Sequence, residues 1–193
     1  MRGQVRIIGG NWRGRKLTIP EVSGVRPTPD RVRETLFNWL APVMPGARCL
    51  DLFAGSGALG FEALSRGAAF VMMVDQSPLV IKALRSQLAA FKGENAEITQ
   101  ATLPAQWPLI QKPFDIVFLD PPYKENLLFP ICNMLEEKKF LADSALIYLE
   151  SDQPIESCNL PSNWKILKCK KAGQVGYYLA ERTGVVNETV DSN

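Results

Sequence analysis

Histidine is missing from this sequence of 193 residues, and cysteine is scarce. Without an imidazole the chain lacks the commonest general base, the Ser–His and Cys–His nucleophile pairs, and the usual ligand of transition metals. No Cys-x-x-Cys spacing occurs, so neither a zinc site nor a dithiol redox motif is expected. The cysteines lie in or beside apolar segments, which predicts reduced core residues: Cys49, Cys132, Cys158 and Cys169. The sequence therefore predicts chemistry without a metal ion.

Long apolar runs are also missing. Stretches such as 145–149 are far shorter than the roughly 18 apolar residues that a membrane-spanning helix needs. The chain starts with basic residues, but the apolar stretch after them is too short for a secretory signal. Hydrophobic residues make up 46% and charged residues 22%, which is ordinary for a globular domain. We expect a compact cytoplasmic protein without a membrane segment.

Charge is unevenly distributed, although the net charge is only +2. Residues 1–48 contain nine Lys and Arg against three acidic residues, a balance of +6, so the rest of the chain carries −4. A basic segment on a near-neutral body is typical of a protein that binds nucleic acid at one end. A solvated charged face would give the same composition. Charge alone leaves both interpretations open.

From residue 48 onward, short β-rich apolar runs alternate with helical patterns, which predicts βαβ units and a parallel sheet. A short turn at Ala172-Gly173 then separates two further strands and predicts a hairpin. This order is typical of a doubly wound α/β sheet of seven strands that ends in an antiparallel hairpin. The expected strands lie near 48–53, 69–75, 96–100, 114–119, 145–150, 164–170 and 174–181, and the expected helices near 57–66, 78–91 and 125–137.

A basic extension precedes this core. Residues 4–8 and 16–19 can pair as a small hairpin across a basic loop, which we expect to be flexible. We therefore divide the chain into an extension (1–45) packed on the core, a catalytic domain (46–183) and a flexible polar tail (184–193).

The extension is expected to end in a helix over residues 28–40. Thr28 has the residue type of an N-cap, and Pro29 would take the first helical position. The helix carries one apolar stripe formed by Val32, Leu36, Phe37 and Leu40. That stripe predicts packing against the sheet.

A glycine-rich segment follows the first strand of the core. Asp51 ends the strand, and Gly55-Ser56-Gly57-Ala58-Leu59-Gly60 lets the backbone turn sharply into a helix and approach a ligand closely. The Gly-x-Gly-x-x-Gly pattern alone would also suit a dinucleotide or a merely structural turn. Asp51 would repel a pyrophosphate but suits the ammonium and hydroxyl groups of S-adenosylmethionine. This favours S-adenosylmethionine over NAD.

The next two strand ends offer further contacts to an adenosine. Asp75 ends the second strand, where its carboxylate can accept both ribose hydroxyls. An ordinary acidic residue before a helix is the alternative interpretation. At the end of the third strand the chain offers Thr102-Leu103 for the adenine, where many relatives of this fold have an Asp.

The tetrapeptide Asp120-Pro121-Pro122-Tyr123 ends a strongly apolar strand and so lies at the edge where such sheets bind ligands. A nucleobase amino group is a poor nucleophile, because its lone pair is delocalised into the ring. Catalysis therefore needs acceptors for its hydrogens, which the Asp120 carboxylate and the Pro121 carbonyl would supply, since the prolines carry no competing N–H. Tyr123 offers a flat face for stacking a flipped-out base. A rigid structural turn is the alternative.

With these motifs the chain resembles the class I, Rossmann-like methyltransferases, and within them the RsmD family of 16S ribosomal RNA guanine-N(2) methyltransferases. The resemblance covers nearly the whole chain. The resemblance rests on the following segments: Arg6–Gly10, Trp12–Leu17, Arg26–Thr28, Arg31–Asn38, Asp51–Gly60, Glu62–Arg66, Asp120–Tyr123 and Ala172–Val175.

The resemblance implies transfer of a methyl group from S-adenosylmethionine to the 2-amino group of one guanine in 16S rRNA, within an assembling small subunit. It implies phosphate contacts by Arg13, Arg15 and Lys16, and places Arg31 on the RNA side. A surface ion pair is the alternative for each arginine. The cofactor side would comprise Asp51, Phe53, Ala54, Gly55, Gly57, Asp75, Gln76, Thr102, Leu103, Arg26 and Thr28.

Other functions remain open from sequence. DNA adenine or another nucleobase amino methyltransferase would use the same tetrapeptide. A non-catalytic RNA-binding assembly factor would keep the fold, although intact Asp120 and Tyr123 argue against it. A dinucleotide oxidoreductase rests on fold analogy only. We expect a monomer.

Overall fold

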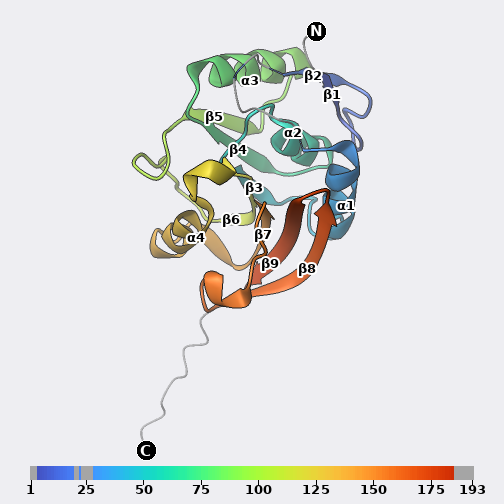
Figure 1. The fold of residues 1–193 in the computed structure, drawn as a ribbon. Helices are drawn as coiled ribbons and strands as arrows, with labels where there is room; N and C mark the ends of the chain where they lie inside the picture. The colour runs from blue at the N-terminus through green and yellow to red at the C-terminus, as the bar shows by residue number, and fades with distance from the viewer. Residues whose placement is uncertain (1–3, 20–21, 23–27, 185–193) are drawn as a thin grey trace, which may run out of the picture.

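The computed structural model describes residues 4–19, 22 and 28–184. Its strands are β1 (Gln4–Arg6), β2 (Lys16–Thr18), β3 (Arg48–Asp51), β4 (Phe70–Asp75), β5 (Ala96–Gln100), β6 (Phe114–Leu119), β7 (Leu141–Ser151), β8 (Trp164–Ala172) and β9 (Val175–Arg182). Its helices are α1 (Asp30–Leu40), α2 (Ala58–Ser65), α3 (Pro78–Phe91) and α4 (Leu128–Glu137), with short 3-10 turns η1 (Tyr123–Glu125) and η2 (Ser157–Asn159) (Figure 1).

The main sheet has seven strands in the order β5-β4-β3-β6-β7-β9-β8. The strands from β5 to β7 run parallel, and β9 lies antiparallel between β7 and β8. The strand order reverses between β3 and β6, which is the point where open α/β sheets bind ligands. This topology confirms the predicted doubly wound sheet with a C-terminal antiparallel hairpin.

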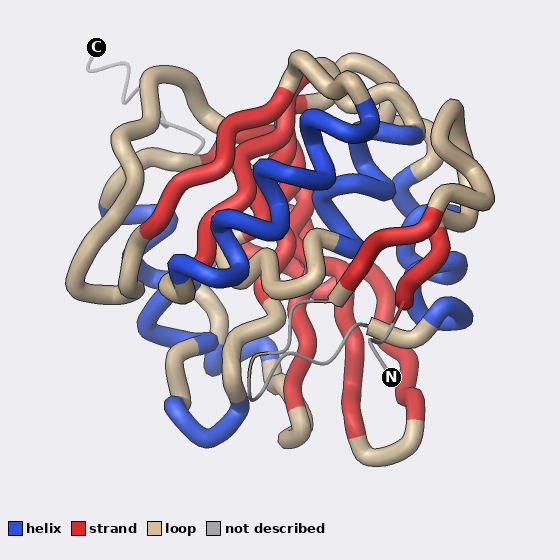
Figure 2. The backbone as a smooth tube through the Cα atoms, turned by 90° about the horizontal axis from the view of Figure 1, so that it is seen from above, coloured by secondary structure: helices blue, strands red, loops and turns tan. Residues whose placement is uncertain are grey.

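Two hydrophobic layers enclose the sheet. α1, α2 and α3 cover one face, where Leu36, Phe61 and Leu84 pack on Cys49 and Phe118. α4 covers the other face together with the segment after β5. Figure 2 shows helices on both sides of the sheet. Because helices cover both faces, β3 and β4 are almost continuously buried, as expected of parallel strands. Within the described residues, no helix is both long enough and apolar enough to cross a bilayer.

The β1–β2 hairpin is fastened to the core through α2. The buried carboxylate of Glu62 accepts hydrogen bonds from the backbone N–H groups of Ile8 (2.9 Å) and Gly9 (2.8 Å). The hydroxyl of Ser65 donates to the carbonyl of Gly9 and accepts from the N–H of Trp12, at 2.5 and 2.8 Å. The loop that the sequence suggested to be flexible is therefore held by hydrogen bonds to one helix.

Three local predictions were wrong. α1 begins at Asp30 with Pro29 as its N-cap, and no side chain caps it, so Thr28 has another role. The expected helix over 125–137 divides into η1 and a shorter α4, and β7 starts four residues before the expected strand, at Leu141. Of the four cysteines, Cys49 and Cys132 are buried, whereas Cys158 and Cys169 are exposed.

Candidate active site

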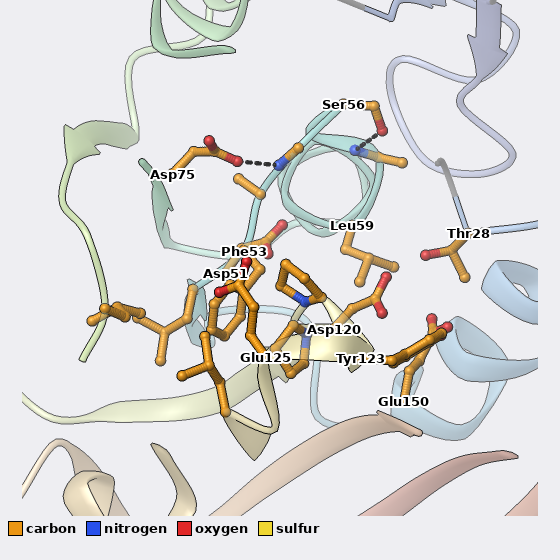
Figure 3. Close-up of a pocket in the computed structure, with 18 of the residues that line it drawn as sticks. Thr28, Asp51, Phe53, Ser56, Leu59, Asp75, Asp120, Tyr123, Glu125 and Glu150 are labelled. Carbon is orange, nitrogen blue, oxygen red and sulfur yellow. Dashed lines mark hydrogen bonds between the residues drawn. The ribbon is translucent and has the colours of Figure 1, made fainter. Parts of the chain in front are cut away.

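A cavity of about 860 Å³ opens at the carboxyl edge of the sheet, beside the point where the strand order reverses (Figure 3). Its walls come from the loops after β3, β4, β5 and β6, from the start of α1 and from the tip of the β8–β9 hairpin. The residues that line it include Thr28, Asp51, Phe53, Ala54, Gly55, Asp75, Gln76, Leu103, Asp120, Pro121, Pro122, Tyr123, Glu150 and Tyr177. Segments far apart in the sequence thus converge on one space large enough for a nucleoside cofactor and a base.

The glycine loop between β3 and α2 forms one wall. Gly57 has φ +76°, and a Cβ there would lie 2.6 Å from Leu84 and 2.7 Å from Phe61, so both the backbone and the packing require glycine. Asp75 fixes the loop from the neighbouring strand: its Oδ2 accepts from the N–H of Gly55 at 3.0 Å, and its Oδ1 from the N–H of Ser77 at 2.8 Å. The carboxylate retains acceptor capacity towards the cavity.

Asp51 lies at the end of β3 and is buried. Burial, together with the negative charge of Asp75, raises the pKa of its carboxyl to about 7, although hydrogen bonds from the backbone N–H groups of Gly60 and Phe53 oppose the shift. An acid held near its neutral form at physiological pH is ready to be ionised by a cationic ligand. Asp51 therefore suits a ligand with an ammonium or sulfonium group.

Asp120 directly follows β6 and lines the cavity between Asp51 and Tyr123 (Figure 3). Burial raises the pKa of Asp120, the charges of Glu150 and Asp51 add to the rise, and a hydrogen bond from Tyr123 opposes it. A carboxylate with a raised pKa is a better proton acceptor than an exposed one.

The two prolines after Asp120 leave one carbonyl free. The carbonyl of Pro122 accepts from the N–H of Glu125 at 3.0 Å, which closes the turn of η1. The backbone hydrogen bonds of turns and loops within residues 4–19, 22 and 28–184 do not involve the carbonyl of Pro121. Pro121 therefore presents an acceptor beside Asp120 without a competing donor.

Glu150 is a lining residue that the sequence reasoning missed. It belongs to β7, is only 5% exposed, and accepts a hydrogen bond of 2.7 Å from the hydroxyl of Tyr148. Burial raises the pKa of Glu150, while hydrogen bonds from the hydroxyls of Tyr148, Thr28 and Tyr123 lower it. The signal was present in the sequence, because the apolar run 145–149 ends in an acid just as the runs before Asp51, Asp75 and Asp120 do.

These acids form a row across four adjacent strands. From one end of the cavity to the other they are Asp75 (β4), Asp51 (β3), Asp120 (after β6) and Glu150 (β7) (Figure 3). In the part of the chain that the structure describes, no three His, Cys, Asp or Glu side chains are grouped to hold a metal ion. A row of separate acceptors instead suits an elongated ligand, or two ligands end to end, rich in N–H and O–H donors.

Some predicted cofactor residues lie elsewhere. Thr102 is exposed and does not line the cavity, although Ala101 and Leu103 on either side of it do. Gly57 shapes the loop without lining the cavity. Thr28 lines it at the Tyr123–Glu150 end rather than beside the glycine loop (Figure 3). Arg26 lies outside the described residues.

The predicted RNA-binding side chains differ in their surroundings. Arg13, Lys16 and Arg31 are exposed. Arg15 is also exposed, but its guanidinium donates to the carbonyl of Ala90 at 2.8 Å and lies 3.8 Å from the centre of the Phe91 ring. Part of its role is therefore to fasten the hairpin loop to the end of α3.

The chain was compared with known protein families and proteins. Residues 5–181 match the family described as Conserved hypothetical protein 95. The chain is 52% identical to Ribosomal RNA small subunit methyltransferase D of Escherichia coli (strain K12) over 182 residues, which cover 93% of this chain and 91% of that protein. The protein of the same name from Haemophilus influenzae is 47% identical over 184 residues, with coverage of 92% and 94%.

The chain belongs to the RsmD family. The solved structure of the Escherichia coli protein yhhF agrees with this assignment: its TM-score is 0.86 at 49% identity, and the match covers 94% of this chain and 99% of that chain. The match of the RsmD family thus extends over the hairpin extension as well as the sheet. The protein is a methyltransferase with the class I, Rossmann-like fold.

Proposed function

We propose that the protein transfers a methyl group from S-adenosylmethionine to the exocyclic 2-amino nitrogen of a guanine in small-subunit ribosomal RNA. The observation that carries this proposal is the row of carboxylates along one cavity, with Asp51 and Asp75 beside the glycine loop and Asp120 at the centre. The names of the relatives, which are small-subunit rRNA methyltransferases, supply the RNA class. The guanine N2 atom follows from the family resemblance.

The glycine-loop end fits S-adenosylmethionine. Its ammonium and sulfonium charges match the ionisable Asp51, and its ribose hydroxyls match the acceptor capacity that Asp75 retains after holding Gly55 and Ser77. When bound, this cofactor supplies an electrophilic methyl group. Apolar surface from Phe53 and Leu103 would contact the adenine, since Thr102 faces away from the cavity.

The Asp120 end fits the amino group that accepts the methyl group. The carboxylate of Asp120 and the carbonyl of Pro121 would each accept one amino hydrogen, which turns the nitrogen lone pair towards the methyl donor. Tyr123 is half-buried on η1 and offers its ring for base stacking. After methylation the nitrogen loses a proton to Asp120 or to water, so no imidazole is needed. Thr28 belongs to this end of the site.

The RNA backbone would be held outside the cavity by exposed cations. Arg13, Lys16 and Arg31 in the N-terminal part of the chain are such exposed cations. The edge strand β8 adds Lys168 and Lys170, and its hairpin tip lines the cavity through Ala172. We further propose that the protein acts as a monomer on an assembling subunit.

The test is nucleoside mass spectrometry of small-subunit rRNA, naked and assembled, after incubation with S-adenosylmethionine and protein. Wild-type protein should produce N2-methylguanosine, and Asp120→Ala should lose most of the activity. Asp143→Asn is the matched control, because its side chain is fully exposed. Transfer to duplex DNA but not to rRNA would contradict the proposed substrate, and equal transfer by wild type and Asp120→Ala would contradict the mechanism.

A further inference from the structure

Glu150 stands beside the proposed methylation site without a role in it. β6 and β7 are parallel neighbours with Leu119 opposite Leu149, so the next residues on the two strands, Asp120 and Glu150, lie side by side. Both line the cavity, and the charge of Glu150 acts on Asp120. A base whose amino group reaches Asp120 can therefore bring its adjacent edge to Glu150.

The surroundings of Glu150 keep its acceptor atoms in place. Tyr148 donates to Oε1 from within the same strand at 2.7 Å, and Thr28 and Tyr123 line the cavity beside the carboxylate. A carboxylate offers about four acceptor positions, so the bond from Tyr148 leaves acceptor capacity for a ligand. Thr28 comes from the segment before α1 and Tyr123 from η1, so three segments of the chain surround this end of the cavity.

A purely structural role does not explain the charge. Glu150 is almost completely buried, yet none of the ion pairs found among the described residues includes it. Burying a carboxylate without a cation is costly, and the carbonyl oxygen of a glutamine at this position would also accept the hydrogen bond from Tyr148. The negative charge therefore indicates a ligand with an N–H donor.

Guanine carries such a donor in the required place. Its N1–H lies next to its 2-amino group on the same edge, whereas adenine has an unprotonated acceptor at N1. We propose that Glu150 recognises the target guanine by accepting its N1–H, while Asp120 and the carbonyl of Pro121 accept the amino hydrogens. This inference rests on the proposed function and adds the residue that selects the base. A carboxylate at this position repels the N1 lone pair of a purine that lacks the hydrogen.

The experiment compares two target bases in otherwise identical small-subunit RNA. The methylated guanosine is first mapped with wild-type protein and then replaced by 2-aminopurine riboside, which keeps the 2-amino group but has an acceptor at N1. Wild-type protein should prefer guanine by roughly 10- to 100-fold in kcat/KM. Glu150→Gln should lose most of this preference, because its amide N–H can donate to N1 of 2-aminopurine. Glu137→Gln on the exposed surface of α4 should behave like wild type.

A conservative variant separates base recognition from folding. Glu150→Asp keeps the charge, but its shorter side chain places the carboxylate farther from the base. The value of kcat/KM should therefore fall while the preference for guanine persists. An unchanged preference in an active, folded Glu150→Gln protein would overturn the role of Glu150 and leave the proposed function intact. Absence of methyl transfer to guanine RNA by wild-type protein would overturn both.

Discussion

Glu62 on α2 and Arg33 on α1 form an ion pair of 3.5 Å, and both side chains are completely shielded from solvent. Arg33 also donates to the carbonyl of Arg6 at 2.8 Å, and Glu62 accepts from the backbone of Ile8 and Gly9. The pair therefore joins the hairpin, α1 and α2. Because Thr28 precedes α1 and its carbonyl accepts from Arg33, this network also positions one wall of the cavity.

The first prediction concerns this network. Glu62→Gln should lower the free energy of unfolding by about 3 kcal/mol, since an amide NH2 would replace a buried oxygen that accepts from backbone N–H groups and from arginines. Urea denaturation monitored by circular dichroism measures the change. Asp143→Asn removes the exposed partner of Arg182 and should have no measurable effect. Equal stability of Glu62→Gln and wild type would show that the pair is dispensable.

The second prediction concerns Asp75. Asp75→Asn keeps the shape of the side chain but removes one of the two oxygens that accept from Gly55 and Ser77, and also the charge. Charge-assisted hydrogen bonds contribute about 1.5–3 kcal/mol each, so the affinity for S-adenosylmethionine should fall roughly 10- to 100-fold. Isothermal titration calorimetry measures this, with Glu97→Gln on the exposed side of β5 as the control. Unchanged affinity would contradict the role of Asp75 in the cofactor site.

The third prediction is a pH dependence due to Asp51. In the ligand-free protein, burial raises the pKa of this carboxyl from 3.8 to about 7, so the folded state favours the neutral acid. Its contribution to stability is complete below pH 3.8 and is lost as the pH rises to about 7, a loss on the order of 4 kcal/mol. Asp51→Asn has no ionisable group at this position, so its stability should not show this decrease with pH.

Urea denaturation of both proteins between pH 4 and pH 8 tests the prediction. The free energy of unfolding of wild type should fall relative to that of Asp51→Asn as the pH rises. A cationic ligand stabilises the ionised carboxylate, so saturating S-adenosylmethionine should reduce the difference. A difference that stays constant with pH would show that Asp51 ionises normally in the folded protein.

The order of strands and helices was predictable because apolar runs and helical periods follow each other regularly along the chain. Asp51, Asp75 and Asp120 were predictable as cavity residues, since the carboxyl ends of parallel strands meet at one edge. Glu150 belongs to the same pattern but comes without a glycine or proline motif, so it attracted no attention. The position of Thr28 depends on the hydrogen bond from Arg33 to its carbonyl, which no local pattern reveals.

The fourth prediction concerns RNA phosphates. Arg13→Ala combined with Lys16→Ala should weaken rRNA binding and reduce the slope of log affinity against log salt by about 1.5, because two cations release fewer counterions. Cofactor affinity should not change. Arg15 is left intact, since it also contacts Ala90 and Phe91 and its loss would confuse folding with binding. Filter binding at several salt concentrations measures the slope; an unaltered slope would place the RNA elsewhere, with the lysines of β8 as the next residues to test.

The last prediction separates the two parts of the Tyr123 side chain. If the ring stacks on the target base, Tyr123→Phe keeps that contact and loses only the hydroxyl, which acts on the pKa values of Asp120 and Glu150, whereas Tyr123→Ala loses both. Base stacking contributes about 1–3 kcal/mol, so kcat/KM should fall on the order of 10- to 100-fold in Tyr123→Ala and much less in Tyr123→Phe. Steady-state methylation of small-subunit RNA gives both values. If Tyr123→Phe loses as much activity as Tyr123→Ala, the hydroxyl rather than the ring is what the reaction requires, and stacking is not the function of this residue.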